Sequence, residues 1–139
     1  MRGKTLIARG FTLVELLIVI IIIAVIAAIA IPKFVNSTDR SKDSSLKADL
    51  KLLRDAINTY SNDCGSYPAT LADLAATAAP ANGVDSTGAS KAINATDWHG
   101  PYMQSIPTDP ESGNAFTYSV TSPTVGNVTS SAGAPYNTY

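Results

Sequence analysis

The stretch FTLVELLIVIIIIAVIAAIAI, residues Phe11–Ile31, decides the fold of this 139-residue chain. Thr12 and Glu15 are its only polar residues, so the run from Leu16 to Ile31 is entirely apolar. As a helix these 21 residues would span about 30 Å, the thickness of one bilayer core. A backbone in lipid must satisfy its own hydrogen bonds, so the stretch predicts a membrane-spanning helix.

Charge and composition differ on the two sides of this stretch. The ten residues before it carry Arg2, Lys4 and Arg9 and no acid, which favours a helix that starts in the cytoplasm. The residues after it are rich in Ala, Ser, Thr, Asn, Gly and Pro, as in a water-exposed domain. The formal net charge is -1 and no basic stripe is present, so the sequence does not indicate nucleic-acid binding.

A second helical pattern follows Pro32, which predicts a helix break or kink at that residue. Apolar residues recur at steps of 4, 3, 4 and 3 on one face: Leu46, Leu50, Leu53, Ile57 and Tyr60. Residues 33–61 are therefore predicted to be an amphipathic half of one helix of about 50 residues. Gly65 is well placed as the left-handed residue that ends it.

The remaining residues predict a small α+β domain. Thr70, with Asp73 three residues later, can begin a short helix, and residues 80–100 have the composition of a long loop. Residues 101–106 and 115–120 are predicted strands, and residues 124–128 are a candidate third. We expect a small antiparallel sheet that packs on the amphipathic half of the helix.

The reactive side chains do not form a catalytic pattern. Cys64 is the single cysteine, so no intrachain disulfide can form. A buried or half-buried thiol is the favoured interpretation, with an intermolecular disulfide or a reactive thiol as alternatives. His99 is the only histidine and lacks a partner at zinc-ligand spacing. We expect no enzymatic activity.

Glu15 needs a reason, because a carboxylate in hydrocarbon is costly. One interpretation is that it reaches back to the membrane interface. Another is that it pairs with a cation. Cleavage between Gly10 and Phe11 would create an α-amine one helical turn away, in the same chain or in a neighbouring copy. A pair between copies would fix their axial offset, and loss of one partner would cost roughly 3–5 kcal/mol.

Residues Arg9–Phe34 closely resemble the amino-terminal segment of type IV pilins and type II secretion pseudopilins. The matching features are the basic leader that ends in Gly10, then Phe11, Glu15 and Pro32. The resemblance implies cleavage after Gly10 by a prepilin peptidase and N-methylation of the Phe11 amine. It also implies that Glu15 neutralises the Phe11 amine of a neighbouring subunit in a homopolymer.

The resemblance further implies a lollipop fold with three parts. Residues 1–10 would be the prepilin leader, residues 11–32 the transmembrane and filament-core helix, and residues 33–139 the globular domain. The subunit would wait in the bacterial inner membrane, in contact with lipid and with its C-terminal domain in the periplasm. An assembly platform and its ATPase would then extract it into an extracellular or periplasmic filament.

Two departures from the family pattern concern the helix and the cysteines. Ala24 stands where many members have glycine, and alanine favours helix by about 1 kcal/mol. The chain also lacks the two C-terminal cysteines of the disulfide-loop pilins. Three kinds of function stay open. The chain could form a pilus-like filament, or it could be the major pseudopilin of a secretion system. It could also be a signal-anchored soluble binding domain, or a secreted protein whose leader is cut after the apolar run.

A calcium site is a further, minor expectation. The C-terminal part of the chain weakly resembles the major pseudopilin of type II secretion, which binds calcium in a C-terminal loop. Asp109, Glu111 and Asn114 lie in one turn and offer the oxygen ligands that calcium prefers. The same residues also form a plain turn around Pro110 and Gly113. Apart from this site, we expect no cofactor.

Overall fold

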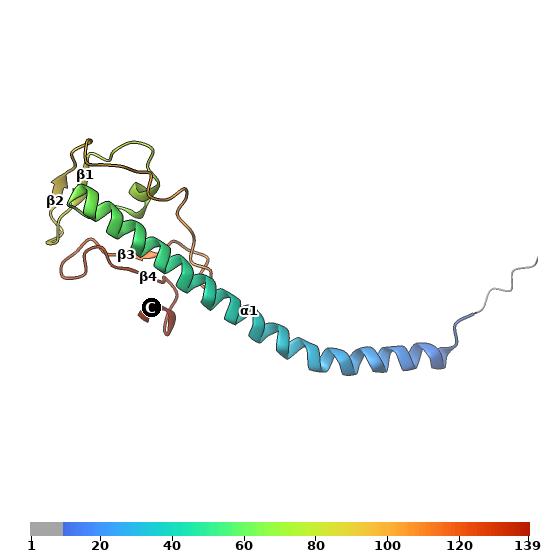
Figure 1. Ribbon diagram of the computed structural model, residues 1–139. Coiled ribbons are helices and arrows are strands. Elements are labelled where there is room, and N and C mark those ends of the chain that lie inside the picture. The colour runs from blue at the N-terminus through green and yellow to red at the C-terminus, as the bar shows by residue number, and fades with distance from the viewer. Residues whose placement is uncertain (1–9) are drawn as a thin grey trace, which may run out of the picture. The chain divides into compact units, whose positions relative to one another are not determined.

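The computed structural model describes residues 10–139, and for residues 32–36 it describes the backbone alone. The elements in chain order are α1 (Leu13–Cys64), η1 (Leu71–Ala75), β1 (Asn82–Val84), β2 (Ser90–Ala92), β3 (Thr117–Tyr118), β4 (Val128–Thr129) and η2 (Tyr136–Thr138) (Figure 1). The chain forms two compact units, one that ends at Arg40 and one from Ser41 to Tyr139.

Helix α1 runs without interruption for 52 residues, which confirms the prediction of one helix of about that length. It passes through Pro32, so the expectation of a break at this residue is wrong. Proline removes one main-chain donor, but the remaining hydrogen bonds of a long helix can hold it together. A kink at Pro32 stays a prediction.

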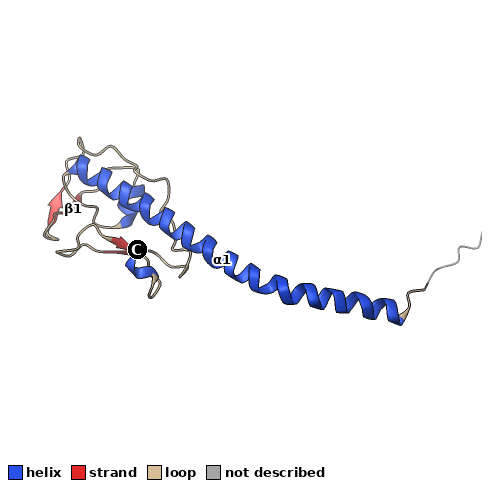
Figure 2. Ribbon diagram, turned by 60° about the horizontal axis from the view of Figure 1, so that its bottom comes forward, coloured by secondary structure: helices blue, strands red, loops and turns tan. Residues whose placement is uncertain are grey.

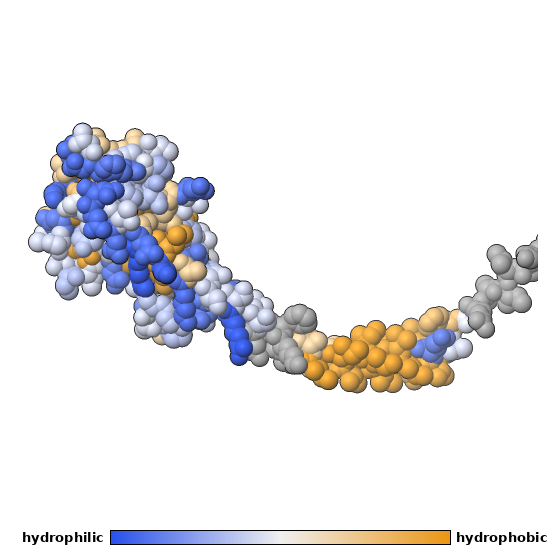
Figure 3. Space-filling model, viewed as in Figure 1, coloured by the Kyte–Doolittle hydropathy of each residue, from blue (hydrophilic) through white to orange (hydrophobic). Residues whose placement is uncertain are grey.

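The unit that ends at Arg40 contains the apolar half of α1. Within the described residues, Leu13–Ile31 is the one segment long and apolar enough to cross a membrane, and none of it is buried in the chain itself. Figure 3 shows most of this segment as a hydrophobic surface, with a hydrophilic patch near its start. Exposed apolar surfaces of this kind are typical of segments that contact a membrane or another protein.

The second unit is built around the amphipathic half of α1. All five residues of the predicted stripe are at most 1% exposed, which confirms the periodicity argument. Leu74, Met103, Phe116 and Val128 from the rest of the unit complete the same core. Each large side chain buried there stabilises the fold by about 1.5–3 kcal/mol.

Gly65 ends α1, as predicted. Its φ of +61° lies in the left-handed region, and its N–H donates to the carbonyl of Ser61 at 2.9 Å. The last turn of α1 carries no basic residue, but the ammonium of Lys91 donates to the carbonyl of Gly65 at 2.8 Å. Lys91 therefore brings a positive charge to the negative end of the helix.

The strands form two separate antiparallel pairs, β1 with β2 and β3 with β4, so the single small sheet expected from the sequence is divided (Figure 2). In the first pair Gly83 is opposite Lys91, and in the second Tyr118 is opposite Val128. The expectation of a loop over residues 80–100 is wrong, since β1 and β2 lie there. Asp85 Oδ1 closes the turn between them by accepting the N–H of Ala89 at 3.0 Å.

The predicted strand over residues 101–106 is also wrong. The N–H groups of Tyr102 and Met103 donate to the carbonyl of Leu74, at 2.9 and 3.0 Å, so this segment is fixed to the end of η1 and forms no strand. The strand predicted over 115–120 is present as β3, and only the last residue of 124–128 belongs to β4. The short helix begun by Thr70 is confirmed as η1, where the Thr70 N–H donates to Asp73 Oδ2 at 2.7 Å.

Side chains of α1 hold the end of the second unit. The guanidinium of Arg54 donates to the main-chain oxygens of Val128 at 3.1 Å and of Tyr139 at 2.5 Å. The ammonium of Lys47 lies 4.5 Å from the centre of the Tyr139 ring, and it pairs with Asp43 at 2.8 Å. These contacts hold β4 and the residue after η2 against the solvent-exposed side of α1.

Candidate functional site

The candidate site is the start of α1, where the main chain changes from extended to helical. Gly10, Phe11 and Thr12 lie before the first helical residue, and the Phe11 side chain is 73% exposed. Thr12 Oγ1 accepts the N–H of Glu15 at 3.1 Å, and the Thr12 carbonyl accepts the N–H of Leu16 at 3.1 Å. Thr12 is therefore the N-cap of α1.

The capping role of Thr12 was missed by the sequence reasoning. The pattern Thr-x-x-Glu, residues 12–15, is the sequence signature of a capped helix start and could have revealed it. The cap has a consequence for the predicted cleavage position. It starts the helix after the Gly10–Phe11 bond, so this bond lies in non-helical, exposed backbone.

Glu15 occupies the first turn of α1 and is exposed in the single chain. The positive end of the helix dipole favours a carboxylate there, typically by 0.3–1 kcal/mol. No ion pair to Glu15 forms among the described side chains, which are those of residues 10–31 and 37–139. The pairing of Glu15 with an amine at Phe11 stays a prediction.

The predicted calcium ligands lie in one turn, and their environment decides whether they fit the ion. Asp109 is fully buried, and its Oδ1 accepts the N–H of Glu111 at 2.9 Å. Asn114 is exposed and uses its main-chain carbonyl to accept the Asp109 N–H at 2.8 Å. Glu111 Oε1 is buried without a hydrogen-bond partner among the described residues.

This arrangement does not fit calcium. The ion takes six to eight oxygen ligands, and the buried Asp109 carboxylate is already occupied by the chain's own donors. The Asp109 oxygens face N–H and O–H groups, whose positive ends repel a cation. No group of three or more His, Cys, Asp or Glu side chains arranged for a metal occurs in the described part of the chain.

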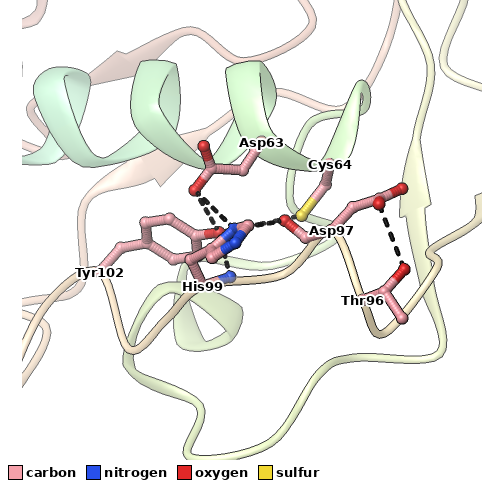
Figure 4. Close-up of polar contacts among 6 residues, drawn as sticks. All are labelled: Asp63, Cys64, Thr96, Asp97, His99 and Tyr102. Carbon is pink, nitrogen blue, oxygen red and sulfur yellow. Dashed lines mark hydrogen bonds and ion pairs between the residues drawn. The ribbon is translucent and has the colours of Figure 1, made fainter.

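A second polar cluster lies at the other end of α1 (Figure 4). The Tyr102 hydroxyl donates to Asp63 Oδ2 at 3.0 Å and accepts the N–H of His99 at 3.1 Å. His99 Nδ1 lies 3.7 Å from the same Asp63 oxygen, and the imidazole is largely exposed. His99 is thus a surface residue of the loop that Tyr102 fastens to the helix.

Cys64 belongs to the same cluster. Its sulfur lies 3.9 Å from the Tyr102 hydroxyl and the residue is buried, so the interpretation as a buried thiol is confirmed. Burial raises the pKa of the Cys64 thiol, which disfavours the reactive thiolate. Nothing in the cluster resembles an activated nucleophile, and its geometry fastens the loop that contains His99 to the end of α1.

Comparison with known proteins gives two family matches. The family described as type II secretion system (T2SS), protein G matches residues 33–134, and the prokaryotic N-terminal methylation motif matches residues 6–31. Together they include both the capped helix start and most of the second unit. No solved structure matches the chain significantly.

Curated relatives include pilins and secretion proteins. The type II secretion system core protein G of Pseudomonas aeruginosa is 29% identical over 110 residues, 78% of this chain and 71% of that protein. The type IV major pilin protein PilA of Myxococcus xanthus is 48% identical over 59 residues, which are 42% of this chain but only 27% of the pilin. The narrow pilus component PilA5 of Thermus thermophilus is 47% identical over 49 residues, 35% of this chain and 42% of that protein.

Proposed function

Because the chain belongs to the family of type II secretion system protein G and carries the prokaryotic N-terminal methylation motif, we propose that it is a structural subunit of a pilus-like filament. The family is one of structural subunits, not of enzymes. One observation carries the proposal: a helix capped by Thr12 begins at Leu13, three residues after Gly10, and leaves Leu13–Ile31 exposed for lipid or other subunits.

The proposed maturation acts on the extended backbone before the cap. A prepilin peptidase cleaves after Gly10, and the new amine of Phe11 is methylated and keeps its positive charge. Thr12 keeps this bond outside the helix, and the exposure of Phe11 supports access to it. Exposed, non-helical segments are the positions where proteases cut most readily.

The proposed assembly uses Glu15 as a device that sets register. When the apolar helices of many copies pack together, the Glu15 carboxylate leaves water and needs a cation. The Phe11 amine of a neighbouring copy supplies this cation. Glu15 is the only charged side chain from Phe11 to Ile31, so the pair forms at one level of the packed helices. An unpaired copy would bury a charge, so the axial offset that forms the pair is favoured.

The proposed location follows from the charges around the helix. Before assembly, Leu13–Ile31 spans the bacterial inner membrane, and the basic residues of the leader keep its start in the cytoplasm. The unit from Ser41 to Tyr139 is then periplasmic. An assembly platform with its ATPase moves subunits from lipid into the filament, which is extracellular or periplasmic.

A role in protein export is a second candidate, favoured by one observation. The protein G match covers residues 33–134, and so includes most of the second unit as well as part of the helix. Under this proposal the filament is the short pseudopilus of a secretion system. Loss of the gene would then leave secreted enzymes in the periplasm, whereas loss of a pilus subunit would remove surface filaments and leave secretion unchanged.

Sequencing of the mature N-terminus tests the filament proposal most simply. The expected first residue is Phe11, with a mass increase of one methyl group on its amine. An N-terminus near Lys33 would identify an ordinary secreted protein. An uncut chain that begins at Met1 would identify a simple membrane anchor, and either result would overturn the proposal.

A further inference from the structure

The buried carboxylate of Asp109 joins two segments that are distant in sequence. Its Oδ2 accepts the hydroxyl of Ser130 at 2.5 Å and the N–H of Ser131 at 2.9 Å. It also accepts the Ser131 hydroxyl at 3.2 Å and the N–H of Ala132 at 3.3 Å. The turn over residues 109–114 is thereby closed against residues 130–132.

The other carboxylate oxygen is used inside the turn. Oδ1 accepts the N–H groups of Glu111 at 2.9 Å and of Ser112 at 3.4 Å. With two donors at Oδ1 and four at Oδ2, six hydrogen bonds converge on one side chain. A carboxylate offers about four lone-pair sites, so none is left for a metal ion.

The burial of this group shows what the hydrogen bonds achieve. Asp109 is 0% exposed and Ser130 is 3% exposed, so an ionised carboxylate lies in a place that normally excludes charge. The positive ends of six N–H and O–H dipoles compensate it. A bound cation would perform the same task with an acidic loop, but no acid follows Glu111 in the chain.

The position of this closure matters for the second unit. The two joined segments flank the β3–β4 pair, since β3 begins at Thr117 and β4 ends at Thr129. A second bridge runs beside the first, where the hydroxyls of Ser112 and Ser131 lie 2.6 Å apart. The closure therefore fixes the entrance to β3 and the exit from β4 at the same point.

We propose that Asp109 closes the C-terminal loop through the chain's own donors, in place of a bound calcium ion, and that the second unit therefore folds without calcium. The inference does not depend on whether the chain forms a pilus or a pseudopilus. In this proposal, the hydrogen bonds of Asp109 hold the turn over residues 109–114 against residues 130–132, a task that a bound calcium ion could otherwise perform.

The test measures thermal unfolding of the full chain in detergent micelles, with a chelator and with millimolar CaCl2. The natural chain should melt at the same temperature in both buffers. Asp109→Asn should lower Tm by about 5 °C or more in both buffers. The asparagine NH2 group would face the N–H and O–H donors that bind the Asp109 carboxylate, so these donors would lose their acceptor. Asp55→Asn makes the same chemical change at an exposed position of α1 and should leave Tm unchanged.

Two results would overturn the inference. One is a rise in the Tm of the natural chain with CaCl2 that disappears in Asp109→Asn, since the carboxylate would then bind the ion. The other is an Asp109→Asn chain that melts like the natural one. If Asp109→Asn does not fold, Ser130→Ala replaces it: a lower Tm in both buffers supports the inference, and no decrease or a dependence on calcium contradicts it.

Discussion

Glu15 is the residue on which the proposed assembly depends. It lies in the first turn of α1, where the helix dipole favours it, and among exposed aliphatic side chains, where a lone charge becomes costly after packing. Both features are present in the single chain, and no ion pair to Glu15 is found among the side chains that the structure describes. Under the proposed function, the amine of another copy supplies that partner.

Replacement of Glu15 by valine should separate insertion from assembly. Glu15→Val keeps the apolar helix, so the chain should still enter the membrane in normal amounts. Filament mass should fall at least about tenfold, because the Phe11 amine of the neighbour loses its partner in an apolar environment. Membrane fractionation followed by quantification of sheared filaments measures both quantities.

Asp55→Val is the matched control, since Asp55 is an exposed acid farther along α1. It should assemble normally. Filaments from Glu15→Val in normal amounts would contradict the pairing role.

Asp109 should make the stability of the folded chain depend on pH. Burial raises its pKa, but hydrogen bonds from the Ser130 hydroxyl and from main-chain N–H groups outweigh this and lower the pKa well below its usual value. The unfolded chain titrates this group at about pH 3.9. The stabilisation is therefore complete above that pH, and it is lost as the pH falls toward the folded pKa.

Urea unfolding between pH 3 and 7 checks this expectation on the full chain in detergent. Glu111 is the other acid of the turn and stays unchanged in both chains. The natural protein should lose more stability below about pH 4 than Asp109→Asn, whose curve should be flatter there. Parallel curves for the two chains would show that the carboxylate is not held by its donors.

At the scale of the element, α1 has a buried and an exposed leucine two residues apart. Leu50 is 1% exposed in the core of the second unit, whereas Leu52 is 55% exposed. Leu50→Ala should lower the free energy of unfolding by about 2–5 kcal/mol through lost burial and a cavity. Leu52→Ala should change it by less than about 0.5 kcal/mol.

Urea unfolding of both variants gives the comparison. Equal losses in the two chains would mean that the helix does not pack its predicted stripe on the rest of the unit.

The elements that the sequence predicted well are those with long-range periodicity. Five core positions of α1 and its end at Gly65 followed from spacing and from one glycine, because a helix of this length repeats its pattern many times. The strands are two or three residues long and carry no such repetition. Tertiary hydrogen bonds decide which segments become strands: the segment with Tyr102 was predicted to be one, but the Leu74 carbonyl accepts its N–H instead.

The hairpin between β1 and β2 had a local signal that its composition hid. Asp85 Oδ1 accepts the Thr87 N–H at 2.8 Å and the Thr87 hydroxyl at 2.6 Å, and Gly88 has a φ of +87°. These residues form a tight turn, yet their small polar side chains are also typical of a loop. Composition alone could not distinguish the two.

For the chain as a whole, the sequence predicted an apolar membrane segment followed by a water-exposed domain. The structure has two compact units, which divide after Arg40. The start of α1 followed from the apolar run, whereas its cap by Thr12 rests on a single local hydrogen bond to the N–H of Glu15 and was not predicted. From the sequence, the turn over residues 109–114 could be a plain turn or a minor calcium site, since an acidic turn has the same residues in both cases. Only the donors of residues 130–132, distant in sequence, distinguish them.

A cryo-electron microscopy map of the native filament at side-chain resolution tests the proposed pairing of Glu15 with Phe11 most directly. The distance to measure joins the Glu15 carboxylate of one subunit to the nearest Phe11 amine. We predict an ion pair between adjacent subunits, with N and O at most about 4 Å apart. A Glu15 carboxylate that faces solvent, far from every Phe11 amine, or a filament that retains residues 1–10, would contradict the account.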